Sequence, residues 1–292
     1  MATPFPQLTP ATNVGEVVTR IDSVITWTLE NQSRLGYFAA LYKRITRAIG
    51  IAVEHGLFED GPRMQHFDAT FANRYFAALN GYFDPTTNPA PTHSWRVAFD
   101  AALLPDPIVV QHMLAGVNAH IKLDLGIAAW EVMLPGPLTP LQSDFDTVNQ
   151  VLADQVKQTV DEIDAISPVL ADIYDVLQND EIDLIDAGLL VFRDSAWDFA
   201  TVLSLEPIVF DPPTIMVRDL ATAAFGALIM NPGKFLGALI AAVAARESRD
   251  IVKNIDVLNG IASEPLIVEN RRVCSALRSQ PARAAKPATG GG

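Results

Sequence analysis

Apolar residues recur along most of the chain at intervals of three and four positions, which is the spacing of one face of an α-helix. The alternation of apolar and polar positions that indicates strands is confined to residues 207–210. The pattern therefore predicts an all-α protein. From the apolar stripes and their Pro, Gly and Asn boundaries, helices are expected at about 15–32, 34–56 with Ser33 as N-cap, 64–83, a short one from 94, 107–133, 141–166, 170–177 and 182–205.

The segment from Pro107 to Met133 is predicted to be one long helix at the centre of the molecule. Proline suits the first turn of a helix, where its missing N–H is not needed, and Pro135 follows the last turn. Apolar residues fall on nearly every side of this helix: Val109, Val110, Met113, Leu114, Val117, Ile121, Leu125, Ile127 and Ala128. Because a helix that is apolar all round is buried, we expect a single large multi-helix globular domain built around it.

The predicted organisation is a proline-rich lead at 1–14, a helical domain at 15–278 and a disordered tail at 279–292. If the domain is divided, the seam is expected near residue 138 or 211. The segment Leu220–Ala245 is rich in Ala, Leu and Ile, but Asn231-Pro232-Gly233 breaks it into two pieces that are too short to cross a bilayer of about 30 Å. It therefore predicts a buried helical hairpin and no membrane span.

Composition and charge narrow the classes of function. Apolar residues make up 49% of the 292 residues and charged residues 19%, as in globular proteins. A net charge of −13 opposes binding to nucleic acid. The N-terminus lacks the form of a secretory signal, so a cytoplasmic protein is expected. The single Cys274 cannot form an internal disulfide.

Polar residues capable of chemistry interrupt the apolar central helix. His120 and Asp124 are one helical turn apart, so a carboxylate can contact an imidazole. His112 lies two turns before His120, and Gly116 between them leaves room for a ligand, a water or another helix. Asn118 and Lys122 are the other polar groups. Burying such groups costs several kcal/mol, at order of magnitude, unless each is paired.

Three hypotheses account for these residues. In the first they form a catalytic or ligand pocket, in which Asp124 orients His120 as acid or base. In the second they form a satisfied hydrogen-bond network that only fixes helix packing. In the third they bind a divalent metal, with His120, Asp124, His112 and Asp144 as candidate ligands. The chain has no His-Glu-x-x-His pair, no repeated Glu-x-x-His and no phosphate-binding or nucleophile-elbow motif.

Charged groups on other predicted helices extend the candidate site. Asp68 and Arg74 lie in the aromatic helix at 64–83, and Arg193 precedes Trp197 by one turn, which allows stacking or pairing with a buried carboxylate. The structural alternative for each arginine is an inter-helix ion pair. Acidic residues in 141–166 are expected to form a solvated face.

The run Asn118-Ala119-His120-Ile121, followed by Asp124-Leu125, resembles the N-A-H-I-x-x-D-L core of a family of helical proteins of unknown function, DUF5995. The segment Phe71–Phe76, Asp144-Phe145 with Val148-Asn149, and Arg193 with Ala196-Trp197 resemble its flanking blocks. The resemblance covers most of Leu35–Leu205 and carries no established activity. It implies one cluster made of Asn118, His120, Asp124, Asp144, Asn149, Arg74 and Arg193, and it leaves His112 aside.

The sequence thus predicts a small-molecule enzyme with a polar site buried between helices, in which His120 is the acid, base or ligand and Asp124 orients it. Asn118 belongs to the same site, and Arg74 or Arg193 holds an anionic group of the substrate. The alternative is a non-catalytic helical binding or scaffold protein, in which the same residues form a structural network.

Overall fold

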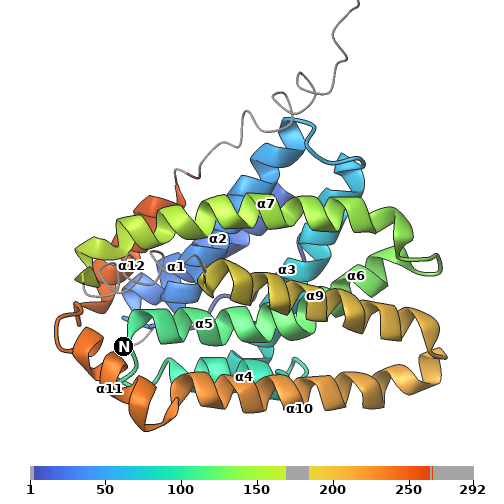
Figure 1. Ribbon diagram of the computed structural model, residues 1–292. Coiled ribbons are helices and arrows are strands. Elements are labelled where there is room, and N and C mark those ends of the chain that lie inside the picture. The colour runs from blue at the N-terminus through green and yellow to red at the C-terminus, as the bar shows by residue number, and fades with distance from the viewer. Residues whose placement is uncertain (1–2, 169–183, 264, 266–292) are drawn as a thin grey trace, which may run out of the picture.

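The computed structural model describes residues 3–168, 184–263 and 265. In these ranges the chain is helical and contains no strand, as the sequence predicts (Figure 1). The elements are α1 (Val14–Glu30), α2 (Leu35–Glu54), α3 (Gly61–Phe83), α4 (His93–Ala101), α5 (Val109–Ala119), η1 (His120–Asp124), α6 (Leu125–Met133), α7 (Thr139–Glu162), η2 (Ile163–Ala165), α9 (Leu184–Leu205), η3 (Ile208–Phe210), α10 (Asp211–Met230), α11 (Gly233–Ala244) and α12 (Ile251–Ala262).

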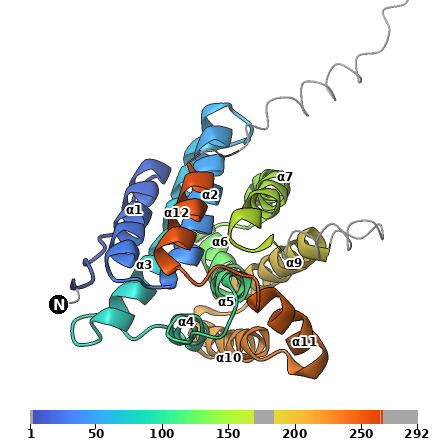
Figure 2. The same ribbon diagram turned by 90° about the vertical axis from the view of Figure 1, so that its left-hand side faces the viewer.

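The continuous unit formed by α5, η1 and α6 is the central helix of the fold. Its first half packs against α2, α4 and α10, and its second half packs against α3 and α9. Seen along the bundle, α5 lies in the middle with the other helices around it (Figure 2). The apolar residues that the sequence shows on every side of this segment are therefore used against several neighbours at once.

Several predicted boundaries differ from those observed. The N-cap of α2 is Arg34 rather than Ser33, and it makes no side-chain capping bond. Pro107 lies before the N-cap of α5, Ile108, so the proline precedes the helix instead of occupying its first turn. Residues 207–210 contain the 3₁₀ helix η3. The helix expected at 170–177, the start of the one expected at 182–205, and the tail at 279–292 lie outside the described residues.

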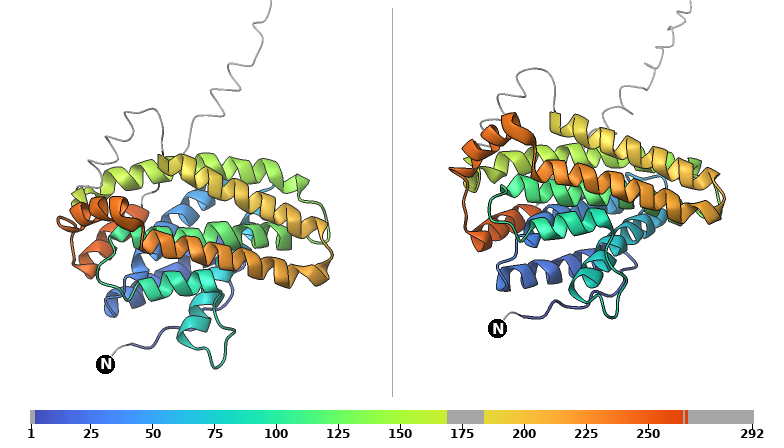
Figure 3. Two further views of the ribbon diagram at one scale, coloured as in Figure 1. Left: turned by 60° about the horizontal axis from the view of Figure 1, so that its bottom comes forward. Right: turned by 90° about the horizontal axis from the view of Figure 1, so that it is seen from below.

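The hairpin expected after Leu220 is present as α10 and α11, but it is not buried. Helix α10 lies on the outside of the bundle (Figure 3). Its buried residues are polar or small, namely Asp211, Asp219, Thr222 and Gly226, while large apolar residues along it are exposed. Asp219 accepts hydrogen bonds from α4, the carbonyl of Thr222 accepts one from Asn118 on α5, and Gly226 allows close approach to both helices, which leaves the large apolar residues outside. By length and composition alone, Ile208–Met230 could also cross a membrane; a single such helix is weak evidence for a span.

Candidate functional site

The central helix changes its winding at the residues that the sequence singles out. His120–Asp124 form a π-helical turn, in which the N–H of Leu125 donates to the carbonyl of His120. A π turn admits one extra residue and is costly in a regular helix, so it is frequent at functional sites. The backbone does not break, and α6 continues directly from it.

Asp124 accepts hydrogen bonds from three different elements. Its Oδ2 accepts from the indole N–H of Trp95 on α4 at 2.7 Å and from Nδ1 of His120 at 3.2 Å. Its Oδ1 accepts from Nε of Arg74 on α3 at 2.9 Å. Burial by itself would raise the pKa of Asp124, but the charge of Arg74 and the bonds from His120 and Trp95 outweigh it and lower the pKa. Asp124 is therefore a buried carboxylate in its ionised form.

His120 is held as a neutral imidazole. Burial lowers its pKa more than Asp124 raises it. The ring is stacked on Phe71 with centroids 3.5 Å apart, and it lies in a T-shaped contact with the Tyr42 ring, with centroids 4.7 Å apart. Because ionised Asp124 can only accept, Nδ1 carries the proton and Nε2 keeps its lone pair. Among the described residues, Nε2 has no hydrogen-bond partner.

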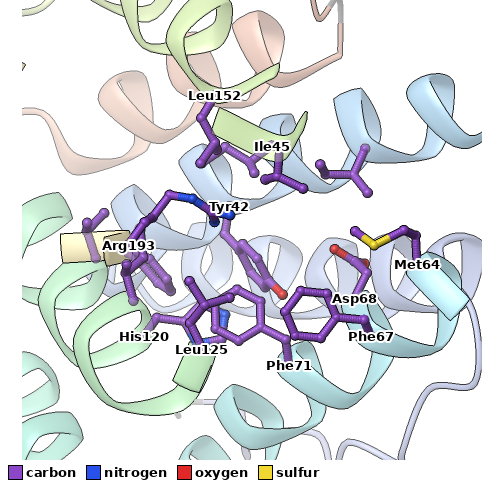
Figure 4. Close-up of a pocket in the computed structure, with 15 residues that line it drawn as sticks. Tyr42, Ile45, Met64, Phe67, Asp68, Phe71, His120, Leu125, Leu152 and Arg193 are labelled. Carbon is purple, nitrogen blue, oxygen red and sulfur yellow. The ribbon is translucent and has the colours of Figure 1, made fainter. Parts of the chain in front are cut away.

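His120 lines a cavity of about 60 Å³ between α2, α3, η1, α7 and α9 (Figure 4). The cavity lies where the two large apolar clusters of the fold meet, since Phe71 and Val117 pack against both. Its walls are mostly apolar, and the polar groups on them are Tyr42, Asp68, His120 and Arg193. Apolar walls with a few polar groups are typical of a small-molecule site.

Asp68 and Arg193 are ionisable residues on this cavity, and neither forms an ion pair with another described residue. Asp68 is 7% exposed, its Oδ2 has no hydrogen-bond partner among the described residues, and burial raises its pKa to about 7. Arg193 is 3% exposed and donates to Asn149 Oδ1 and, at 2.7 Å, to the carbonyl of Phe145. Its guanidinium lies 4.3 Å from the Phe145 ring rather than on Trp197, and burial lowers its pKa to about 9.

A second, more open cavity of about 340 Å³ lies on the other side of the histidine–aspartate pair. It is lined by Arg74, Trp95, Asp124 and Glu131, and Glu131 is 3.4 Å from Nη1 of Arg74. Arg74 is therefore already neutralised by two carboxylates. The pair formed by His120 and Asp124 separates the apolar cavity from this polar cleft.

The structure places the other sequence candidates away from the cavity. Asp144 accepts from the backbone N–H groups of Glu59 and Asp60 and from Arg63 at 2.8 Å, so this acidic residue is a buried cap and not part of a solvated face. The amide of Asn118 donates to the carbonyl of Thr222 on α10. These two residues connect helices.

His112 lies in a separate part of the core. It contacts Tyr37, with ring centroids 5.8 Å apart, and burial lowers its pKa to about 4. The space beside Gly116 is filled by another helix, because a Cβ there would lie 2.4 Å from Cγ of Phe38 on α2. In the part of the chain that the structure describes, no group of three or more His, Cys, Asp or Glu residues could hold a metal ion.

Three residues of the site were not among the main sequence candidates. Trp95 and Tyr42 look like ordinary core aromatics, and no local spacing connects them to Asp124 or His120. Asp68 gives a weak signal, as a carboxylate one turn after Met64 on an aromatic helix. Its importance depends on burial, which comes from helices distant in sequence.

The chain matches one protein family. The model of the "Family of unknown function (DUF5995)" matches residues 14–232, which is three quarters of the chain. The match begins before Leu35 and continues through α10, so it is longer than the sequence motifs indicate. No curated protein and no solved structure matches.

Proposed function

The chain belongs to the DUF5995 family, and we propose that it is an enzyme that moves a proton on a small, largely apolar substrate bound in the 60 Å³ cavity. The observation that carries this proposal is the state of His120, whose Nδ1 is bound by Asp124 and whose Nε2 has no partner among the described residues. A neutral imidazole fixed from one side is the arrangement of a general base.

Asp68 supplies the complementary group. A carboxyl group with a pKa of about 7 is protonated in half of the molecules at neutral pH, so it can donate a proton that His120 does not hold. His120 takes a proton from one atom of the substrate, and Asp68 delivers one to another atom. An isomerisation by this route leaves the proton count of the substrate unchanged. After product release, protonated His120 gives up its proton and Asp68 regains one by exchange with water, which restores both groups, so no co-reactant is needed.

Asp124 acts as a positioning residue. It keeps the imidazole in the Nδ1–H tautomer, while Arg74 and Trp95 keep Asp124 ionised and fixed. The same bonds favour the alternative, a purely structural network, because they join α3, α4 and η1. The enzyme requires the lone pair of Nε2 as a base, whereas the structural network makes no use of Nε2.

His120→Asn tests the proposal, because the asparagine amide can still donate to Asp124 while the basic nitrogen is lost. We expect wild-type protein, incubated with a pool of small metabolites, to convert at least one compound detectable by mass spectrometry, and the variant to lose at least about 100-fold of that rate. The thermal unfolding midpoint should change by only a few degrees.

The imidazole tautomer gives an independent readout. Long-range ¹H–¹⁵N NMR spectra at pH 7 should show His120 neutral, with a protonated Nδ1 and an unprotonated Nε2. A protonated Nε2, or unchanged turnover in His120→Asn, would contradict the enzyme and favour the structural network.

A further inference from the structure

Arg193 is a buried cation that has no ion-pair partner among the described residues. Among the described residues, no carboxylate lies within 4 Å of its guanidinium, and Asp146 and Asp194 act on it only from a distance. Its partners are the amide oxygen of Asn149, the carbonyl of Phe145 and the Phe145 ring. Burying an unpaired charge is expensive, and a buried charged group on a cavity with a strongly shifted pKa is a candidate for a ligand-binding site.

We infer that the substrate of this site is a small monocarboxylate whose carboxylate group binds Arg193. That this compound is converted rests on the proposed function, whereas its binding to Arg193 does not. Guanidinium groups bind carboxylates with strong, charge-assisted hydrogen bonds. The bonds to Asn149 and Phe145 use the N–H of Nε and one N–H of Nη2, so the two N–H groups of Nη1 and the second N–H of Nη2 are left for the ligand.

The charges around the cavity favour one negative charge on the ligand and no more. Arg193 is the single cationic side chain among the described residues that line it. Asp68 lies on the same cavity, and its raised pKa shows that even one carboxylate there is poorly compensated. A dicarboxylate would place its second charge among Phe67, Phe71 and Met64.

The size of the cavity limits the apolar part of the ligand. About 60 Å³ of cavity volume holds roughly four to six water-sized groups, since each needs at least about 10–15 Å³. Without movement of the walls, it accommodates a carboxylate with one or two further carbon atoms. Propionate is therefore a suitable probe, and hexanoate is too long.

The test compares propionate with propionamide, hexanoate and succinate by ligand-observed NMR titration of the full chain. We expect propionate to bind at least about tenfold more tightly than the other three. In Arg193→Met the preference over propionamide should fall below about twofold. Arg193→Lys, which keeps the charge, should retain part of it, and Arg20→Met, on α1 and far from the cavity, should retain all of it.

The outcomes separate this inference from the proposed function. If propionate and propionamide bind equally well, or if Arg193→Met keeps the full preference for propionate, then the inference of a monocarboxylate ligand is wrong. His120→Asn should keep the wild-type preference, because it removes proton transfer and leaves Arg193 in place. If propionate binds as expected while His120→Asn leaves turnover unchanged, the inferred ligand stands and the proposed catalytic role fails.

Discussion

A carboxyl group in a protein core normally has a cation or several donors beside it, and Asp68 has neither among the described residues. Its pKa rises from 3.8 to about 7. A raised pKa means that the folded state binds the proton more tightly than the unfolded state does. The protein is therefore expected to lose stability as pH rises from about 4 through 7, by up to about 4 kcal/mol from this group.

Asp68→Asn should remove this loss, because asparagine resembles the protonated acid and does not titrate. We expect the variant to match the wild type in stability near pH 4 and to exceed it by up to about 4 kcal/mol at pH 8, measured by urea unfolding. A variant no more stable than the wild type at pH 8 would show that Asp68 is compensated. A stabilising substitution at a cavity-lining carboxyl is the pattern of a residue kept for function.

Asp124 presents the opposite case, a carboxylate compensated from three sides. Asp124→Asn should destabilise the protein by about 3 kcal/mol, because Arg74 loses its buried negative partner. The substitution also places an amide N–H₂ where hydrogen-bond donors converge. Glu131→Gln is the matched control, since Glu131 contacts the same arginine from an exposed position and should cost less than about 1 kcal/mol. Equal losses in the two variants, measured by urea unfolding, would contradict this assignment.

At the scale of residues, the sequence could indicate only contacts along one helix. His120 and Asp124 are four residues apart, so their contact follows from helix geometry. The bond from Trp95 to Asp124, and the position of Asp68 and Arg193 on one cavity, depend on how α2, α3, α4, α7 and α9 pack. Spacing in one sequence carries no information about that packing.

At the scale of elements, the helices follow from periodicity, but their ends and irregularities do not. The stripe from Val17 to Thr28 faces the core as α1, as its spacing requires. The π turn at His120–Asp124 leaves no trace in the pattern, because apolar residues surround that segment and every register looks equally buried. The start of α5 at Val109 was missed because Gln111 caps the backbone N–H of Ile108, a role that proline at 107 does not reveal.

The close contact of α5 with α2 depends on Gly116. Replacing this glycine by alanine would place a methyl group 2.4 Å from Cγ of Phe38, so Gly116→Ala should destabilise the protein by about 1–3 kcal/mol despite the better helix propensity of alanine. Gly260→Ala, on α12 with nothing within 4 Å, is the matched control and should stabilise by about 0.5–1 kcal/mol. Urea unfolding of both variants checks the difference in sign. If Gly116→Ala also stabilises, α5 and α2 do not pack this closely.

At the scale of the whole molecule, α10 is arranged opposite to an ordinary surface helix. Asp219 lies inside, where it accepts from the backbone N–H groups of His93 and Ser94 at 2.8 Å each and so caps α4. Leu220 and Leu228 are 49% and 61% exposed on the other side. The prediction of a buried hairpin is wrong because apolar composition alone does not show which face of a helix is buried, and the fully buried positions of α10 are polar or small residues.

In most helices, replacing a large apolar residue costs more stability than replacing a polar one. For α10 we predict the reverse. Leu220→Gln and Leu228→Gln should each change the free energy of unfolding by less than about 1 kcal/mol, because about half or more of each residue stays exposed to water in the folded protein. Asp219→Ala should cost about 1–3 kcal/mol, because it leaves two backbone donors of α4 without an acceptor. Urea unfolding at low protein concentration measures all three. If the leucine variants lose more stability than Asp219→Ala, then the outer face of α10 is covered in the folded protein, and the polar contacts of Asp219 are not what attaches this helix.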